Sequence, residues 1–145
     1  MGDFWPGNIM VSLNQKGDKL EHLHILDWEI TRAGLPGIEI GQFCAEIHML
    51  RRFNPEVCQE TSTLVLEHFF KAYATAAAGG GVDLEQRRKA FVHMGVHLSI
   101  LAARVEWGGK EVTRQVVLEG LGIIIDGYKT KTTAVDDFFG LMLIA

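Results

Sequence analysis

The residues near the start of the chain with the clearest chemical potential are two carboxylates and an amide. Asp3 and Asn8 lie five residues apart, and Asp27 follows a later apolar segment. Oxygen ligands of this kind suit Mg²⁺, which binds one or two carboxylates and leaves its other positions to water and phosphate. A carboxylate beside the metal can orient a hydroxyl group and accept its proton. A site for phosphate chemistry is therefore expected if the fold brings these side chains together.

A short hairpin is expected to do this. Residues 9–13 and 22–28 have the composition and alternation of strands, and the polar residues 14–18, which include a glycine, form a turn between them. Asp27 then ends the return strand and comes back beside the loop of Asp3 and Asn8. Acids and amides are common at turns and strand ends for purely structural reasons. The spacing alone therefore leaves open that these residues serve only as turn and strand-end residues.

Helices are expected to fill the rest of the chain. An irregular stretch holds Gly34, Pro36, Gly37 and Gly41, where helix is not expected to persist. Asn54 and Pro55 are typical of a helix start, and Asp83 with Gln86 forms a capping box. The expected helices are 40–52, about 55–78, 83–107, 110–128 and 132–143. The fold class is therefore α+β and mostly α, with a small β-hairpin followed by four or five helices.

Composition excludes several classes of protein. The 145 residues make one domain, and a net charge of −4 gives no attraction to nucleic acid or anionic lipid. No apolar run approaches the ~20 residues that a membrane span needs. Cys44 and Cys58 are too few for a disulfide scaffold and are expected to be reduced thiols. A cytoplasmic protein without nucleic-acid or membrane partners is expected.

Two sequence motifs together resemble those of a known family. The run Gly2-Asp3-Phe4-Trp5-Pro6-Gly7-Asn8 precedes the hairpin, and Ile25-Leu26-Asp27-Trp28-Glu29 follows it. They closely resemble the aminoglycoside phosphotransferase and choline kinase-like family, in which a His-Gly-Asp-x-x-x-x-Asn catalytic loop precedes an Ile-Asp-Trp-Glu type metal motif. Residues 37–43 resemble the Asp-Ile-Gly segment that follows. This family is the small-molecule branch of the protein-kinase-like fold.

The resemblance implies a role for each matching residue. Asp3 would be the catalytic base, and Asn8 and Asp27 would hold Mg²⁺, with Glu29 a more distant or second-metal contact. ATP or GTP would donate its γ-phosphoryl group to a hydroxyl of a small molecule. The chain would form a single domain, the C-terminal lobe of a kinase-like phosphotransferase. Residues 1–41 would carry catalytic loop, hairpin and metal motif, and residues 42–145 the helical subdomain.

The sequence departs from the family in three places. Met1 stands where the family has histidine, and Glu39 stands where it usually has aspartate. The third departure is that no nucleotide-binding N-terminal lobe precedes the catalytic loop, which predicts a truncated fragment. The missing lobe, or a partner, would cover an exposed apolar face. The alternative is a catalytically inactive helical remnant that serves as a regulatory or binding module.

Other candidate sites are weaker. His93 and His97 have a spacing that can bind zinc, but residue 94 is Met rather than the Glu of the zincin pattern, and packing is the favoured interpretation. Neither cysteine has a neighbouring histidine in sequence, which argues against nucleophilic catalysis.

Overall fold

The structure, a computed structural model, describes residues 1–77, 83–105, 108–129 and 135. Its elements in chain order are η1 (Pro6–Asn8), β1 (Ile9–Leu13), β2 (Leu20–Ile25), α1 (Pro36–Phe53), α2 (Pro55–Ala76), α3 (Leu84–Leu101) and α4 (Lys110–Tyr128). The described part is thus α+β and mostly helical, as expected, with four α-helices and one antiparallel hairpin. No described helix is long and apolar enough to cross a membrane.

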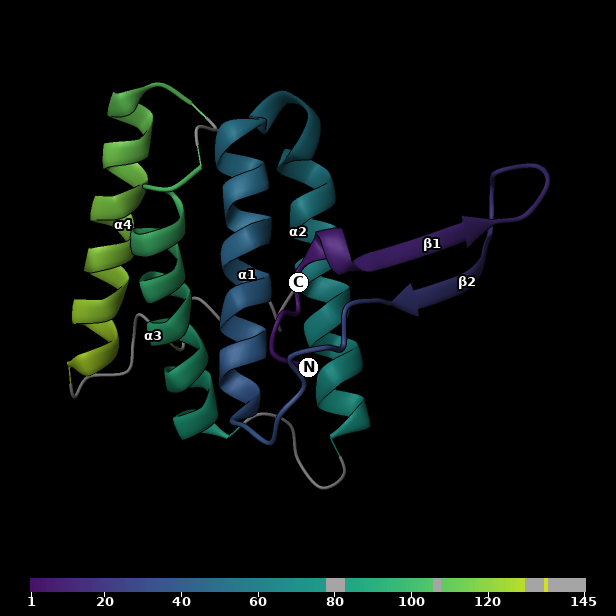
Figure 1. Cartoon of the computed structure of the whole chain (residues 1–145), viewed down its shortest axis with the longest axis horizontal. Helices are drawn as coiled ribbons and strands as arrows, with labels where there is room; N and C mark the ends of the chain where they lie inside the picture. Colours follow the sequence, from purple (N-terminus) through teal and green to yellow (C-terminus); the bar gives the residue numbers. More distant parts are fainter. Residues whose placement is uncertain (78–82, 106–107, 130–134, 136–145) are drawn as a thin grey trace.

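The helix α1 is the centre of the molecule. It lies between α2 and α3, and α4 packs on α3 at the far side (Figure 1). The expected apolar face of α1 is confirmed, because Ile40, Phe43 and Ile47 are buried. However, Cys44, Ala45, Glu46 and Met49 are buried as well, so most of the circumference of α1 is covered. A helix covered by two neighbours is a rigid support for whatever its remaining surface holds.

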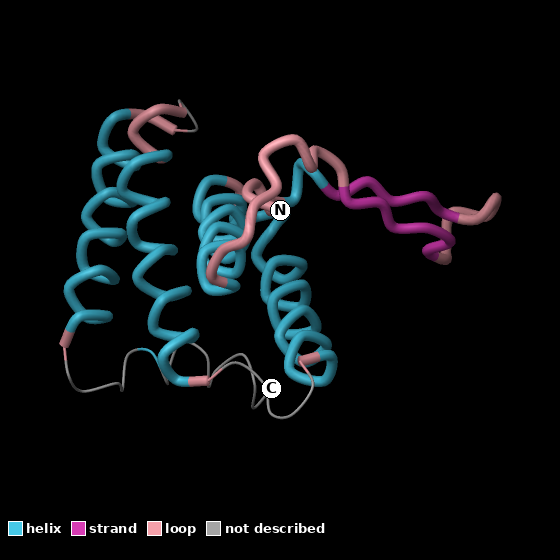
Figure 2. The backbone as a smooth tube through the Cα atoms, turned by 60° about the horizontal axis from the view of Figure 1, so that its bottom comes forward, coloured by secondary structure: helices cyan, strands magenta, loops and turns pink. Residues whose placement is uncertain are grey.

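The hairpin projects from this helical body (Figure 2). The register pairs Ile9 with Ile25 and Val11 with Leu23, which places these apolar side chains on one face. Only the pair at the base is partly covered, and Val11 and Leu23 are each 53% exposed. An isolated two-stranded hairpin is marginally stable in water. The hairpin therefore carries exposed apolar side chains.

The return strand differs from the prediction. It covers Leu20–Ile25 rather than 22–28, so Asp27 does not end it but lies two residues beyond. The reason is the partner strand, which begins at Ile9 because the 3-10 turn η1 with Pro6 precedes it. No extended segment is there to pair with residues beyond Ile25. The chain leaves the sheet at that point.

The start of α1 also differs from the prediction. The helix begins at Pro36 instead of residue 40 and contains both Gly37 and Gly41. A Cβ atom on Gly41 would lie 2.4 Å from the carbonyl oxygen of Ala90, and one on Gly37 would lie 3.0 Å from the nitrogen of the same residue. These glycines therefore permit close packing of α1 on α3 rather than breaking the helix.

The helix limits are otherwise close to expectation. Asn54 and Pro55 begin α2, and the Asp83 carboxylate accepts a hydrogen bond of 2.7 Å from the Gln86 nitrogen at the start of α3. However, α3 ends at Leu101, not at residue 107, and residues 106–107 lie outside the described part. The expected helix 132–143 also lies outside it, except for the buried Val135.

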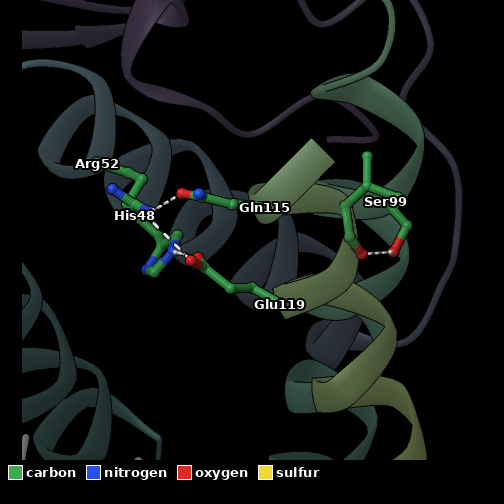
Figure 3. Close-up of polar contacts among 6 residues, drawn as sticks. His48, Arg52, Ser99, Gln115 and Glu119 are labelled. Atoms are coloured by element: carbon green, nitrogen blue, oxygen red, sulfur yellow. Dashed lines mark hydrogen bonds and ion pairs between the residues drawn. The ribbon is translucent and has the colours of Figure 1, made fainter. Parts of the chain in front are cut away.

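A polar cluster joins the far end of α1 to α4. Figure 3 shows His48 and Arg52 directed at Glu119, with contacts of 3.3 Å to each, and Arg52 also donates to Gln115 at 2.9 Å. Burial lowers the pKa of His48, and the charges of the neighbouring arginines act in the same direction against the opposing effect of Glu119. A lowered pKa favours the neutral form of His48.

Candidate active site

The loop that precedes the hairpin is fastened to α1. Phe4 stacks on Phe43 of α1 with ring centroids 5.0 Å apart, and Phe69 of α2 lies 4.7 Å from Phe43 and 6.0 Å from Phe4. This aromatic group anchors the loop in the core between α1 and α2. Such contacts combine large apolar burial with favourable ring geometry. The residue before Phe4 is Asp3, which is therefore presented from a fixed backbone.

The Asp3 carboxylate accepts hydrogen bonds at both oxygens. Oδ2 accepts from Nδ2 of Asn8 at 3.1 Å, and Oδ1 accepts from Nε2 of Gln42 at 2.6 Å. The Asn8 amide also donates to the Asp3 main-chain oxygen at 3.0 Å, and Asn8 itself is buried. The sequence-predicted pair of Asp3 and Asn8 is thus brought into direct contact by one turn of 3-10 helix.

Glu39 holds the backbone just before Asp3. Its Oε1 atom accepts a hydrogen bond from the Gly2 nitrogen, so the residue that replaces the expected aspartate still reaches the loop. Gly2 has φ +102°, a conformation that favours glycine. A Cβ atom there would also lie 2.9 Å from the Ile30 carbonyl oxygen. The segment after the hairpin therefore passes directly against the loop.

Asp27 lies on that returning segment. The nitrogen of Leu26 donates to the Asn8 carbonyl oxygen at 2.8 Å, which ties the residue before Asp27 to the loop. Asp27 itself has φ +61°, and the indole nitrogen of Trp28 donates to the Ile25 oxygen at 2.7 Å. Asp27 and Glu29 are both exposed. The structure thus places Asp27 on the adjoining loop, and among the described residues no hydrogen bond or ion pair joins its carboxylate to Asp3 or Asn8.

The available oxygens are of the kind that Mg²⁺ binds. Because Nδ2 of Asn8 donates to Asp3, the amide oxygen Oδ1 lies on the opposite side of that amide group and is an oxygen donor of the type that Mg²⁺ binds. An exposed Asp27 carboxylate on the adjoining loop supplies a second oxygen donor. One carboxylate and one amide are a usual protein contribution to a magnesium ion that also binds phosphates and water. The donor set therefore fits this metal.

Sequence reasoning missed the part played by Gln42 of α1. Gln42 was not among the candidate residues, although it makes the shortest contact to Asp3. Its position three residues after Glu39 and one before Phe43 shows only that the three share a helix face. No local pattern indicates that Gln42 meets Asp3, which is far away in the sequence.

The histidine pair and the cysteines, the weaker candidates from the sequence, lie in environments that favour a structural role. His97 of α3 contacts Glu46 of α1 at 2.8 Å, and burial followed by the charge of His97 lowers the pKa of His93. No group of three or more His, Cys, Asp or Glu side chains among the described residues has metal-binding geometry. Burial raises the pKa of Cys44 far above its usual range, which makes this thiol a poor nucleophile. Both cysteines are free.

Comparison with known proteins gives two informative matches. The chain is 25% identical over 121 residues to "4-hydroxytryptamine kinase" of Psilocybe cyanescens, covering 83% of this chain and 32% of that protein. It is 24% identical over 127 residues to the protein of the same name from Psilocybe cubensis, covering 87% and 33%. The chain therefore spans about a third of the length of these curated relatives. No family model matches. The two matches support a kinase-like family for this chain.

Proposed function

We propose that this chain is the catalytic-loop-bearing part of a small-molecule kinase of the aminoglycoside phosphotransferase and choline kinase-like type. The observation that carries the proposal is the loop geometry, in which Asp3 is fixed between Asn8 and Gln42 while an exposed Asp27 adjoins it. The kinase names of both relatives support the same reaction class.

The proposed reaction transfers the γ-phosphoryl group of ATP or GTP to a hydroxyl. The hydroxyl oxygen bonds to the γ-phosphorus as the bond from that phosphorus to the β–γ bridging oxygen breaks, and the nucleoside diphosphate leaves. Asp3 orients the hydroxyl and accepts its proton. Asn8 and Asp27 would hold Mg²⁺, which when bound neutralises charge on the phosphate oxygens, and Glu29 would support Asp27. Beyond these roles, the protein would contribute by holding the acceptor hydroxyl and the γ-phosphoryl group in position for transfer.

The acceptor to test first is the one named for the relatives. Both are called 4-hydroxytryptamine kinase, so 4-hydroxytryptamine is a reasonable first substrate for a chain that shares their reaction class. Other small molecules with a hydroxyl group belong to the same proposal. We also propose a cytoplasmic location for this chain.

A nucleotide-binding lobe is the proposed partner of the hairpin. The apolar face around Val11 and Leu23 is half exposed, and Leu13 and Leu20 extend it with 52% and 56% exposure. A lobe supplied by the same polypeptide or by a separate chain would cover this face and close the nucleotide cleft. Residues 1–145 would then act as a single C-terminal domain. Joining a matching N-terminal lobe is expected to raise phosphoryl transfer.

The central experiment measures Mg²⁺-dependent binding of ATP by calorimetry. We expect binding that requires Mg²⁺ and that Asp27→Asn abolishes, because the variant loses the carboxylate charge. The matched control is Glu21→Gln on the exposed strand β2, which should bind as the unaltered chain does. Absence of binding in excess Mg²⁺, or equal binding by Asp27→Asn, would contradict the proposal.

A second measurement separates binding from chemistry. Asp3→Asn should retain Mg²⁺-dependent nucleotide binding but lose phosphoryl transfer to the acceptor. Transfer that persists in this variant would show that the base assignment is wrong. Nucleotide binding by the unaltered chain without transfer, even with an added N-terminal lobe, would favour the non-catalytic binding module over the kinase.

A further inference from the structure

One face of α1 holds three consecutive residues of the loop. Glu39, Gln42 and Phe43 contact Gly2, Asp3 and Phe4 respectively. Positions separated by three and four residues lie side by side on a helix, so the three contacts form one row. The row combines a carboxylate that holds the backbone, an amide that holds the reactive side chain and a ring that anchors the loop. Of these, only the Gln42 contact reaches the Asp3 carboxylate.

The two donors to Asp3 come from independent parts of the chain. Asn8 approaches Oδ2 from within the loop, whereas Gln42 approaches Oδ1 from the helix at 2.6 Å. A carboxylate with one donor can rotate about its Cβ–Cγ bond, but donors at both oxygens fix its plane. Each oxygen has two lone pairs, so one on each remains free to accept a hydroxyl proton.

A glutamine is chemically suited to this task. Its amide donates without carrying a positive charge, so it orients the carboxylate but does not neutralise it as an arginine or lysine would. Gln42 is half-buried on a helix that is packed between α2 and α3, which restricts the position of its own backbone. A support of this kind is what a catalytic group needs to stay within a fraction of an ångström of its working geometry.

We propose that Gln42 is the positioning residue of Asp3, and this rests on the proposed function of Asp3 as the catalytic base. The amide fixes the orientation of the carboxylate and ties it to the central helix. Gln42 does not touch the reacting atoms. Its loss should therefore lower the rate of phosphoryl transfer while the affinity for Mg²⁺ and nucleotide, held by Asn8 and Asp27, changes little.

The hydrogen bond itself is tested by NMR, without any need for activity. In the ¹⁵N-labelled chain, the side-chain amide resonance of Gln42 is assigned from its disappearance in Gln42→Met. We expect this resonance to shift in Asp3→Asn, which removes the carboxylate to which the Gln42 amide donates. Gln59, exposed on α2, is the internal control, and its resonance should not shift. A Gln42 resonance that behaves like that of Gln59 would overturn the proposal.

The effect on chemistry is tested with two substitutions at the same position. Gln42→Met keeps the length of the side chain but removes the donor, and kcat should fall by about 10- to 100-fold with the KM for nucleotide unchanged. Gln42→Glu places a second carboxylate against Asp3, so kcat should fall further and recover on acidification as the introduced carboxyl becomes a donor. Gln59→Met is the matched control and should retain full activity.

These outcomes separate the two proposals. If the unaltered chain binds no nucleotide in excess Mg²⁺, the proposed function fails, and the NMR measurement still decides whether Gln42 holds Asp3. If Gln42→Met lowers nucleotide affinity as much as kcat, Gln42 supports the whole site rather than Asp3, and the positioning role is wrong. A pH profile of Gln42→Glu that parallels the unaltered chain would overturn it too.

Discussion

The loop of residues 2–8 and the hairpin follow each other in the chain but are supported very differently. Residues 2–4 are each held by a side chain of the central helix, and Phe4 enters the core beside Phe43 and Phe69. The hairpin of β1 and β2 extends away from the helices, with Val11 and Leu23 each 53% exposed (Figure 1). Only the Ile9–Ile25 end is joined to the helical body.

This difference teaches which part of the site is preorganised. Asp3 has both carboxylate oxygens engaged, so its orientation is set by the fold before any substrate binds. Asp27 is on the exposed side, beyond the hairpin, and its carboxylate is free to turn toward a metal or phosphate. Under the proposed function, the base Asp3 is held in place by the helical body. Asp27, the proposed metal ligand, would take its final position only when a nucleotide-binding lobe packs on the hairpin.

The largest expected effect comes from removing the aromatic anchor. Phe43→Ala should lower the free energy of unfolding by about 3–5 kcal/mol, because Phe43 is buried and contacts both Phe4 and Phe69. Leu23→Ala on the hairpin should lower it by less than about 1 kcal/mol. Urea denaturation monitored by circular dichroism measures the free energy of unfolding of both variants. Equal losses would break the comparison by showing that the hairpin is as tightly integrated as the loop.

The next effect concerns how closely α1 approaches α3. Gly41→Ala introduces a Cβ atom 2.4 Å from the Ala90 oxygen, so the helices must separate, at a cost of about 1–3 kcal/mol. Gly122→Ala on α4 is the control, because its Cβ meets nothing within 4 Å and helix propensity alone should stabilise by about 0.5–1 kcal/mol. Thermal unfolding measures both. A Gly41→Ala variant that is more stable than the unaltered chain would show that α1 does not pack closely on α3, which would contradict its role as a rigid support for the loop.

A smaller and local effect is expected in the hairpin turn. Gly17 has φ +73°, so Gly17→Ala strains the turn by about 1 kcal/mol. Hydrogen exchange of the β1 and β2 amides should quicken while that of α1 stays unchanged. Gly34→Ala, in an open loop without a positive φ, is the control. Faster exchange in α1 would show that the hairpin and the helical body are coupled, which would contradict the difference in support described above.

The smallest effect is a pH dependence at the far end of α1. The pKa of His48 is lowered in the folded state, mainly by burial, so the unfolded chain binds this proton at a higher pH. The stabilising contribution is complete above the ordinary histidine pKa of about 6.5 and is lost as the pH falls through the lower folded value. The melting temperature should therefore decrease on acidification, and less so in His48→Gln.

The control for this measurement is His68→Gln, which removes an exposed histidine of α2. This variant should keep the pH dependence of the unaltered chain. If the Gln42 amide resonance also moved over the pH range in which His48 titrates, the two ends of α1 would be coupled. An unmoved resonance would show that the loop-holding end is independent, which sharpens the contrast with the exposed hairpin.

The sequence alone determined the class of the fold and the first pair of the candidate site. Alternation, turn residues and capping signals predicted β1, α2 and α4 closely, because they act within a few residues of the chain. The sequence singled out Asp3 and Asn8 as candidates, and in the structure one 3-10 turn brings their side chains into direct contact. The errors were at the end of α3, at Asp27 and at the start of α1, and in the last two cases a partner strand and a neighbouring helix decide the outcome.

Only the tertiary structure decided what holds Asp3. Gln42 is a helix residue with an ordinary polar side chain, and nothing near it in the sequence indicates that it meets Asp3. The same packing turned Gly37 and Gly41 from expected helix breakers into contact points with α3. Local patterns encode how a segment folds by itself, whereas the meeting of distant segments depends on how all of them share one core. The polar residues of the loop can therefore be picked out in the sequence, whereas the Gln42 contact that holds Asp3 is seen only in the tertiary structure.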